Sequence, residues 1–376
     1  MRGVAHVNVA AIERNVAALR AATTGGAALC AVVKADGYGH GAVAAARAAL
    51  DGGARWLAVV TVEEAAVLRA AGIDARLLVL GPLDAEDLPR ALDADADVVV
   101  WEREGLERLH RLGRPARVHV KLDSGMGRLG QRDPREATRI AEALAADDRL
   151  VLAGAMTHFA SADEPGGRFL DEQLDRFRRW AEPLRDAHPG TVLHAANSAA
   201  LLARPASHLD LVRPGVAIYG LDPFQGDPAE HGLEPALEWH SRLVSVKPLE
   251  AGESVGYGQR FVARAATTIG TVPQGYADGV RRALAPGGGE VLVGGRRVPM
   301  AGTVSMDSFG IDLGPGARDA VDAPVRLIGR DGDARLPAEE VAHRLGTINY
   351  EVTCAIGARV PRVHHRDGRP LGPDPA

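Results

Sequence analysis

The feature of this sequence most able to do chemistry is a lysine followed by a glycine-rich turn. Residues 28–33 form an apolar run, Lys34 follows it directly, and glycines stand at positions 37, 39 and 41. A lysine at the rim of a buried strand is partly desolvated, which favours the neutral amine that can form a Schiff base with a carbonyl group. A lone lysine in such a place is more often a strand-end residue whose charged amine reaches solvent. A catalytic role for Lys34 therefore needs support from the rest of the chain.

Short apolar runs of strand length recur through the first 212 residues, and Lys34 follows the first of them. Helical patterns, such as those at 62–72 and 170–184, separate most of them. Alternating strands and helices predict a parallel sheet, and eight such units predict a closed (β/α)8 barrel; a doubly wound open sheet is the second choice. The predicted strands are 28–33, 56–60, 77–80, 97–101, 118–122, 150–156, 192–195 and 209–212.

The pattern changes after about residue 232, where short strand-like runs are punctuated by glycine and proline. We expect a barrel domain over 8–232 and a mostly antiparallel β domain over 233–376, joined by an N-terminal strand at 1–7. One helix is expected at 338–345. The predicted strands of this domain are 243–247, 267–272, 290–293, 297–300 and 325–328.

Composition restricts the partners of the protein. The 376 residues carry a net charge of -5 and no basic run, which argues against nucleic acid or a membrane surface as partner. The chain has no apolar stretch of about 18 residues that could span a membrane. Two cysteines, Cys30 and Cys354, do not make a disulfide framework and favour a reducing compartment. We therefore expect a cytoplasmic protein that acts on a small molecule, with no metal centre.

Several polar residues follow the predicted barrel strands. In a barrel of this kind the loops after the strands meet at one face, and chemistry collects there. Each residue has an ordinary alternative explanation, such as a core histidine or a helix cap, but their common placement favours a site. They are Lys34, Lys121, Arg128, His158, Asn197, Ser198 and Arg213.

Seven motifs in order along the chain resemble those of the alanine racemases, a family that depends on pyridoxal 5'-phosphate (PLP). The resemblance covers nearly the whole chain and implies interconversion of L- and D-alanine, which supplies D-alanine for bacterial peptidoglycan. The motifs are VKADGYGHG at 33–41, HVKLDSGMGRLG at 119–130, ANS at 196–198, VRPGVAIYG at 212–220, VGYG at 255–258, GYADG at 275–279 and SMD at 305–307.

The resemblance implies two groups that move the proton of the substrate α-carbon. Lys34 would hold the cofactor covalently and act as one acid/base, and Tyr257 would be the other. Racemisation removes a proton from one face and returns one to the other, so two flanking groups suit it. His158 would lie beside Tyr257 and connect to Arg213 and His194.

The remaining implied roles concern binding. Arg213 would donate a hydrogen bond to the pyridine nitrogen and leave it unprotonated, which weakens the ring as an electron sink and favours reprotonation over transamination. Arg128 would face the phenolic oxygen of the cofactor and, together with the backbone amide of Met306, bind the substrate carboxylate. Lys121, which is carbamylated in many family members, would orient Arg128. The cofactor would also be contacted by Tyr38, Asn197, Ser198, Gly215, Val216 and Tyr350, with Tyr276 and Asp307 in support.

The resemblance further implies a homodimer in which each site takes Lys34 from one chain and Tyr257 from the other. The chain departs from the common family pattern at Gly256, usually serine, and at Thr303, often arginine. A racemase for serine or for several amino acids is therefore the nearest alternative. A PLP-dependent decarboxylase of basic amino acids would be expected to have an acidic residue in place of Arg213, and a non-catalytic PLP carrier would lack the β domain.

Overall fold

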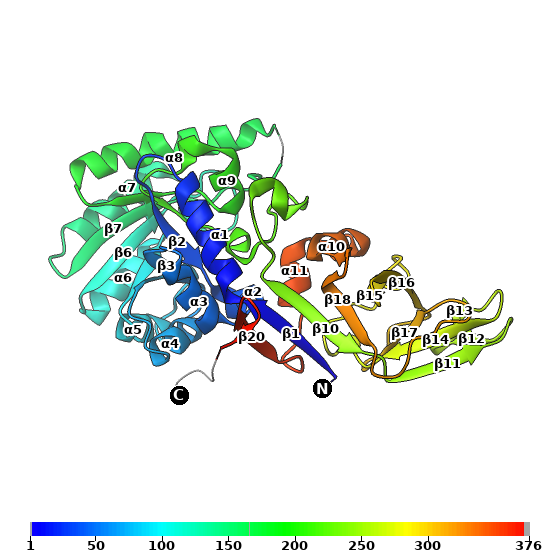
Figure 1. Ribbon diagram of the computed structural model, residues 1–376. Coiled ribbons are helices and arrows are strands. Elements are labelled where there is room, and N and C mark those ends of the chain that lie inside the picture. The colour runs from blue at the N-terminus through cyan, green and yellow to red at the C-terminus, as the bar shows by residue number, and fades with distance from the viewer. Residues whose placement is uncertain (1, 165, 372–376) are drawn as a thin grey trace. The chain divides into compact units, whose positions relative to one another are not determined.

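The chain divides into two compact units, whose elements are labelled in Figure 1. The computed structural model describes residues 2–164 and 166–371. Of the described residues, the barrel unit comprises those at 12–218 and 231–233, and the β unit comprises those at 2–11, 219–230 and 234–371.

The barrel unit is a closed barrel of parallel strands, which confirms the predicted fold class. It closes where β2 pairs with β9 through Ala28 and Leu211. The strands read as nearly continuous apolar runs because helices cover their outer faces. Their bounds are β2 (Ala28–Val32), β3 (Trp56–Val59), β4 (Arg76–Val79), β5 (Ala96–Val100), β6 (Ala116–Lys121), β7 (Leu150–Met156), β8 (Val192–His194) and β9 (Leu211–Val212).

Helices follow the barrel strands and lie outside them (Figure 1). Local sequence fixes several starts: Thr61 and Glu64 form a reciprocal capping box at α4, and the Asp133 side chain accepts from the backbone of Arg135 at α7. The helices are α1 (Val9–Ala22), α2 (Lys34–Tyr38), α3 (Ala42–Asp51), α4 (Val62–Ala70), α5 (Asp87–Asp93), α6 (Arg103–Leu112), α7 (Pro134–Ala145), α8 (Arg168–Ala187) and α9 (Ser198–Ala203), with short 3-10 turns η1 (Pro205–Ser207) and η2 (Val216–Tyr219).

The β unit is built on a large, mostly antiparallel sheet, in the order β11-β14-β17-β16-β15-β18-β10-β1-β20-β21 with β19 against β18. The N-terminal strand β1 lies between β10 and β20 and pairs in parallel with β20. The strands are β1 (Gly3–Asn8), β10 (Leu237–Arg242), β11 (Ser245–Leu249), β14 (Thr267–Val272), β15 (Glu290–Val293), β16 (Arg296–Ala301), β17 (Phe309–Asp312), β18 (Pro324–Asp331), β19 (Ala334–Leu336), β20 (Arg362–Arg366) and β21 (Arg369–Pro370), and β12 (Ser254–Val255) pairs separately with β13 (Phe261–Val262).

Two details of this unit compare directly with the sequence predictions. Helix α10 (Ala338–Leu345) is the predicted helix at 338–345. The predicted strand at 243–247 is partly wrong, because residues 243 and 244 connect β10 to β11. Strand β10 was not predicted, because its apolar and polar residues alternate only at its first end, where Leu237 and Trp239 are buried.

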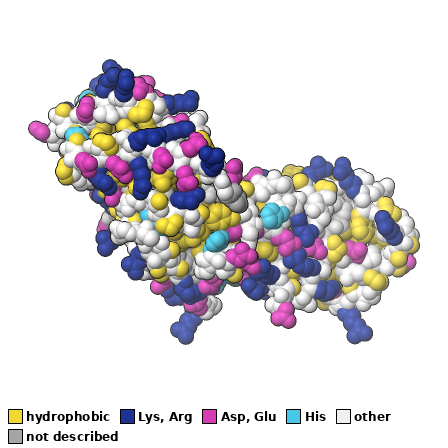
Figure 2. All heavy atoms as spheres, turned by 90° about the horizontal axis from the view of Figure 1, so that it is seen from above, with side chains coloured by type: hydrophobic (Ala, Val, Ile, Leu, Met, Phe, Trp, Pro, Cys, Tyr) yellow, Lys and Arg dark blue, Asp and Glu magenta, His cyan; other side chains and the backbone are white. Residues whose placement is uncertain are grey.

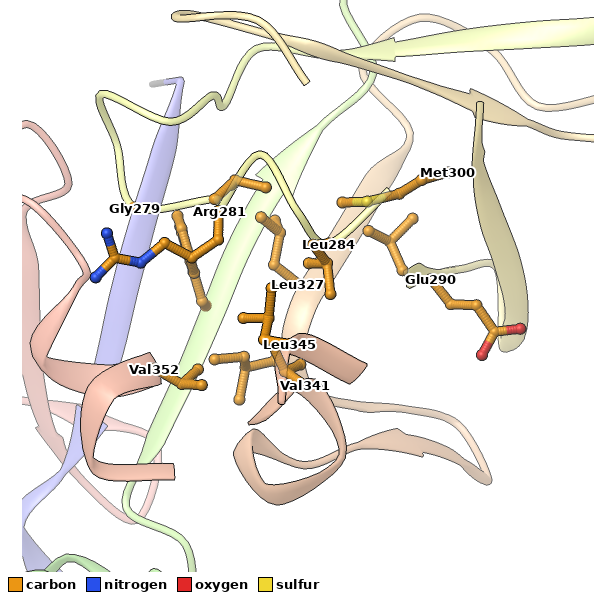
Figure 3. Close-up of a pocket in the computed structure, with 13 residues that line it drawn as sticks. Gly279, Arg281, Leu284, Glu290, Met300, Leu327, Val341, Leu345 and Val352 are labelled. Carbon is orange, nitrogen blue, oxygen red and sulfur yellow. The ribbon is translucent and has the colours of Figure 1, made fainter. Parts of the chain in front are cut away.

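An apolar pocket in the β unit lies where α10 and α11 (Asn349–Cys354) pack over the sheet (Figure 3). Leu284, Leu327, Val341 and Val352 line it, and the charged ends of Arg281 and Glu290 point away from its centre. Side chains of this kind fill the space between a helix layer and a sheet, so we interpret the pocket as part of the core of this unit.

The surface carries charged side chains of both signs. On the face seen in Figure 2, basic and acidic side chains are interspersed and form no extended basic patch. None of the helices in the described ranges is both long and apolar enough to cross a bilayer.

Candidate active site

Most of the predicted barrel residues lie at the carboxyl ends of the strands, where a barrel of this kind carries its chemistry. Lys121 is the last residue of β6 and His194 the last of β8, while His158 and Arg213 follow β7 and β9 within two residues. Lys34 begins the turn after β2. Parallel strands all end at the same mouth, so these five residues share one end of the barrel.

The turn that begins at Lys34 has an unusual backbone. Ala35, Asp36 and Tyr38 have φ of 51°, 51° and 53°, and Gly37 between them has φ of 60°. These are left-handed helical angles, which cost a residue with a Cβ roughly 1–2 kcal/mol each relative to the right-handed form. Strain of this kind is found where a chain must present a group in one fixed way. Here the group is Lys34, whose Nζ lies 5.9 Å from the centroid of the Tyr38 ring.

Two carboxylates hold this turn in place. Glu64 accepts a 2.6 Å hydrogen bond from the Ala35 amide and a 2.8 Å bond from the Val60 amide, and so ties the turn to the loop after β3. Asp36 accepts from the amide of Ala42 at the start of α3 (2.8 Å). The strained backbone is therefore fixed by hydrogen bonds at the two residues that follow the lysine.

The polar groups at the barrel mouth are mainly cationic, and they converge on His158. Burial lowers the pKa of His158 well below its usual range, and the positive charges of Arg213, Lys121, Arg128 and Lys34 lower it further. The imidazole is therefore neutral at neutral pH. A site surrounded by fixed positive charge is suited to an anionic ligand.

Lys121 responds to the same charges. Burial, together with the positive charges of Arg213 and Arg128, lowers the pKa of Lys121 to about 8. A substantial fraction of the amine is then neutral near that pH, which is the form able to react with an electrophile.

Arg213 is almost completely buried and held on several sides. Its Nη1 donates to Nδ1 of His194 (2.9 Å), and its Nη2 donates to the carbonyl oxygens of Thr157 (2.8 Å) and Ala195 (3.1 Å). Nδ1 of His158 lies 3.4 Å from the same Nη2. Burial lowers the pKa of Arg213 to about 10, so the guanidinium stays protonated at neutral pH. Its orientation is set by the barrel itself.

Ser198, Gly215 and Tyr38 form a small polar cradle, in which Gly215 stands two residues after this arginine. Ser198 Oγ accepts from the amides of Gly215 (2.9 Å) and Ala217 (3.3 Å), which places Val216 between two anchored residues. A Cβ at position 215 would lie 2.3 Å from the Tyr38 hydroxyl, so only glycine lets that hydroxyl approach the backbone. Asn197 caps α9 by accepting from the amide of Ala200 (2.9 Å). Hydroxyls beside backbone amides are a setting that binds phosphate.

Arg128 lies on a loop organised by one carboxylate. Asp123 Oδ1 accepts from the amides of Gly125 (3.0 Å), Met126 (2.7 Å) and Gly127 (3.1 Å). The end of the loop is joined to the end of β6, where the amide of Gln131 donates to the carbonyl of Lys121 (2.9 Å). Arg128 is exposed at the tip of this loop.

The predicted residues of the β unit lie on exposed loops. Tyr257 is 75% exposed and opens a 3-10 turn, η4 (Tyr257–Gln259). Gly256 before it has φ of 79° and ψ of -179°, a conformation essentially restricted to glycine, which explains why this chain has no serine there. Thr303 donates to the carbonyl of Tyr257 (3.1 Å), so the second departure from the family pattern supports the same turn.

Tyr276 and Met306 lie on two loops joined by backbone hydrogen bonds. The amide of Tyr276 donates to the carbonyl of Ser305 (3.0 Å), and that of Ala277 to the carbonyl of Met306 (3.1 Å). Both side chains are about half exposed. Asp307 accepts from Arg359 (2.8 Å). Tyr350 is partly buried in α11. The structure thus forms two groups of predicted residues, one in each unit.

The sequence prediction missed three buried or bridging groups that support the barrel group. Glu64 was seen only as part of a helical pattern, Asp97 only as a member of a strand, and His119 only as the first residue of the motif at 119–130, with no role of its own. A polar residue inside an apolar run is a detectable signal, but the partner of each lies far away in the chain.

The buried histidines predict how stability depends on pH. Burial lowers the folded-state pKa of His119 below the ordinary value of 6.5 and that of His194 and His158 well below it. The unfolded chain therefore binds more protons than the folded chain once the pH falls below about 6.5, and stability decreases as the pH falls. We expect the midpoint of urea unfolding to decrease steadily from pH 7 to pH 5. A midpoint that stays constant or increases over this range would contradict the assignment of neutral imidazoles.

Comparison with known proteins identifies the family. Residues 7–223 match the model of the alanine racemase N-terminal domain, and residues 236–364 match that of the C-terminal domain. The chain is 41% identical to an alanine racemase of Halalkalibacterium halodurans (96% of this chain, 95% of the relative) and 43% identical to one of Frankia casuarinae (96% of each). The chain therefore belongs to the alanine racemase family.

Solved structures agree with this assignment. The crystal structure of alanine racemase from E. faecalis has a TM-score of 0.91 at 37% identity and covers 97% of this chain and 98% of its own. The enzyme from Bacillus anthracis, solved with bound L-Ala-P, has a TM-score of 0.90 at 37% identity, with 99% and 97% covered.

Proposed function

We propose that this protein is a PLP-dependent alanine racemase that interconverts L-alanine and D-alanine. The observation that carries the proposal is Arg213, a buried and protonated guanidinium fixed at the barrel mouth among the groups that follow the strands. A related decarboxylase would be expected to have a carboxylate there. Family membership and the ordered motifs support the same activity.

The barrel residues fit PLP as a cofactor. The hydroxyls of Tyr38 and Ser198 and the backbone at Gly215 and Val216 form a cradle suited to its phosphate, and glycine at 215 is needed for that cradle to close. Tyr350 completes the set of phosphate-side residues that we propose, and Asn197 is a further residue that would contact the cofactor. Lys34 would hold the cofactor covalently from its strained turn. Arg213 would face the pyridine nitrogen as a donor and keep it unprotonated.

Lys34 and Tyr257 carry the protons in this proposal. When bound, PLP draws electrons away from the substrate α-carbon and so makes its proton removable. Lys34 Nζ exchanges a proton at one face of that carbon, and the hydroxyl of Tyr257 of the partner subunit exchanges one at the opposite face. His158 would lie beside the tyrosine as a neutral group, and it connects through Arg213 to His194.

The substrate is held by its carboxylate. Arg128, on the loop that Asp123 fixes, binds that carboxylate together with the backbone amide of Met306. Lys121 orients Arg128 once carbamylation has made it an anion, and its lowered pKa of about 8 favours that reaction. Tyr276 narrows the entrance, and Asp307 supports the loop of Met306 through Arg359.

We also propose a head-to-tail homodimer, as the family resemblance implies, in which each site takes Lys34 from one chain and Tyr257 from the other. The location is the cytoplasm, where D-alanine is made for peptidoglycan. The partner is a small-molecule substrate, with neither nucleic acid nor membrane involved.

The decisive assay follows the optical activity of L-alanine by circular dichroism with the purified, yellow holoenzyme. We expect the signal to decay to zero with alanine and more slowly with L-serine. L-lysine and L-ornithine are tested in parallel for release of carbon dioxide. If alanine gives no change and ornithine releases carbon dioxide, the protein is a decarboxylase and the proposal is wrong; if serine racemises faster than alanine, the substrate assignment is wrong.

A further inference from the structure

A continuous line of buried polar groups runs through the barrel core behind Arg213. Arg213 Nη1 lies 2.9 Å from Nδ1 of His194, and Nε2 of His194 lies 2.8 Å from Nδ1 of His119. Nε2 of His119 then lies 3.0 Å from Oδ2 of Asp97. His119, His194 and Asp97 are completely buried. The line connects the barrel mouth with a carboxylate on the second residue of β5.

The carboxylate at the end of this line is held by two arginines. Arg76 donates to Oδ2 of Asp97 through Nε (3.0 Å) and Nη2 (2.7 Å), and Arg117 donates to Oδ1 (2.5 Å). The guanidinium of Arg76 also stacks over the Trp56 ring at 3.7 Å. Burial alone would raise the pKa of Asp97, but hydrogen bonds from His119, Arg76 and Arg117 lower it to about 2. Asp97 is therefore an ionised group that can only accept hydrogen bonds.

An acceptor at one end and a donor at the other fix every proton between them. Because Asp97 only accepts, Nε2 of His119 must carry its proton, and Nδ1 of a neutral His119 is then an acceptor. That acceptor takes the Nε2 proton of His194 and leaves Nδ1 of His194 as an acceptor for Arg213. Burial lowers the pKa of both imidazoles, so both are neutral. One arrangement of protons satisfies all three bonds.

Two irregular features of the barrel, a register shift and a strand glycine, accommodate this line. The ladder between β6 and β7 shifts register between Val118 and His119. On the neighbouring strand, a Cβ at Gly154 would lie 2.2 Å from Nδ1 of His119. Strand glycines weaken a sheet and mark places where another group approaches closely. A barrel core needs apolar side chains for stability, so a polar line that displaces them indicates a role beyond packing.

We propose that Asp97 and His119 are positioning residues for Arg213. Through His194 they hold Nη1 of the guanidinium in one orientation, so that its remaining N–H groups face the ring nitrogen of the cofactor. This proposal rests on the proposed function, since Arg213 has a ring nitrogen to face only if PLP is the cofactor. Positioning groups of this kind, acting one or two residues away from the chemistry, typically change activity by about 10- to 100-fold when they are removed.

Three variants of the full-length holoenzyme test it. Asp97→Leu removes the acceptor, and Asp97→Asn keeps one oxygen that can still accept from His119. Trp56→Phe changes the packing against His119, whose ring it meets edge to face at 5.8 Å, and against Arg76, but removes none of the three hydrogen bonds of the line. We expect Asp97→Leu to lower kcat by about 10- to 100-fold with little change in KM, Asp97→Asn to fall between it and the wild type, and Trp56→Phe to have a much smaller effect.

The histidine tautomers give a readout that does not depend on activity. In protein labelled with ¹⁵N-histidine, we expect His119 and His194 to carry the proton on Nε2 in the wild type and in Trp56→Phe, and both tautomers of His194 to appear in Asp97→Leu. The signal that is missing from the spectrum of His119→Gln belongs to His119, and the signal that is missing from that of His194→Gln belongs to His194. If Asp97→Leu does not fold, the proposal is tested by the kcat of Asp97→Asn and by the histidine tautomers of the wild type.

Two results would overturn the proposal: a wild-type His194 protonated on Nδ1, or an Asp97→Leu enzyme with wild-type kcat and tautomers. An equal loss of activity in Trp56→Phe would assign the effect to packing and also overturn it. A wild-type protein that does not racemise alanine refutes the proposed function instead, while the tautomers still report whether the line is ordered as described.

Discussion

Replacing Lys34 by alanine will lower racemisation of alanine by about 10⁴-fold and remove the yellow colour of the holoenzyme. Lys34 has two roles in the proposed mechanism, as the covalent anchor of the cofactor and as one of the two proton carriers. It is presented by a left-handed turn that Glu64 and Asp36 fix. We expect loss of both the activity and the covalent link.

The chain offers a simple control for this experiment, because it contains only three lysines, Lys34, Lys121 and Lys247. Lys247 is exposed on β11, and Lys247→Ala is expected to retain wild-type activity and colour. Reduction of the holoenzyme with borohydride followed by peptide mapping should find the cofactor on Lys34. Label on Lys121, or retention of activity in Lys34→Ala, would show that the anchor has been misassigned.

The second large effect is expected for Tyr257→Phe, which removes one hydroxyl from an exposed side chain. The variant should keep its colour, since Lys34 is intact, but lose about 10²- to 10⁴-fold in turnover, chiefly when L-alanine is the starting substrate. The reason is that one face of the α-carbon then has no proton carrier. Rates of deuterium exchange and of racemisation, measured from each enantiomer, separate this loss from a general defect.

A matched control is Val262→Ala, which trims another exposed side chain from the neighbouring strand β13. Val262→Ala is expected to leave turnover within about twofold of the wild type, as surface substitutions usually do. Unchanged turnover in Tyr257→Phe would remove the tyrosine from the mechanism.

The same two inactive variants, mixed under conditions that allow subunit exchange, test whether the sites are shared. In a mixed dimer one site combines an intact Lys34 with an intact Tyr257, while the other contains both substitutions. With random exchange, half of the dimers are mixed and half of their sites are intact, so about one quarter of wild-type activity should return. If each site is formed within one chain, no activity returns, and the proposal of shared sites is wrong.

The features of the fold and the site that could be predicted from the sequence are those that depend on residues close together in the chain. The barrel was predictable because its strands are short apolar runs that alternate with helical patterns. Because all its strands are parallel, a polar residue after one strand must lie at the same mouth as a polar residue after another. Lys34, Lys121, His158 and Arg213 could therefore be grouped without knowing the contacts between them.

The residues of the β unit were predictable only by resemblance. Tyr257 lies between two glycines on an exposed turn, and nothing in its spacing separates it from an ordinary turn residue. The structure explains the departure at position 256 in physical terms, because the backbone there has φ of 79°, which a serine does not adopt without strain.

The sequence by itself determined the order of the barrel strands and the polar side chains that follow them, because these depend on the period of apolar residues and on motifs that are contiguous in the chain. Only the tertiary structure decided what holds those side chains. The line from Arg213 through His194 and His119 to Asp97 joins residues 19, 75 and 22 positions apart. It depends on a register shift in β6 and on a glycine in β7, because hydrogen bonds across a barrel form only when the strands bring donor and acceptor within about 3 Å.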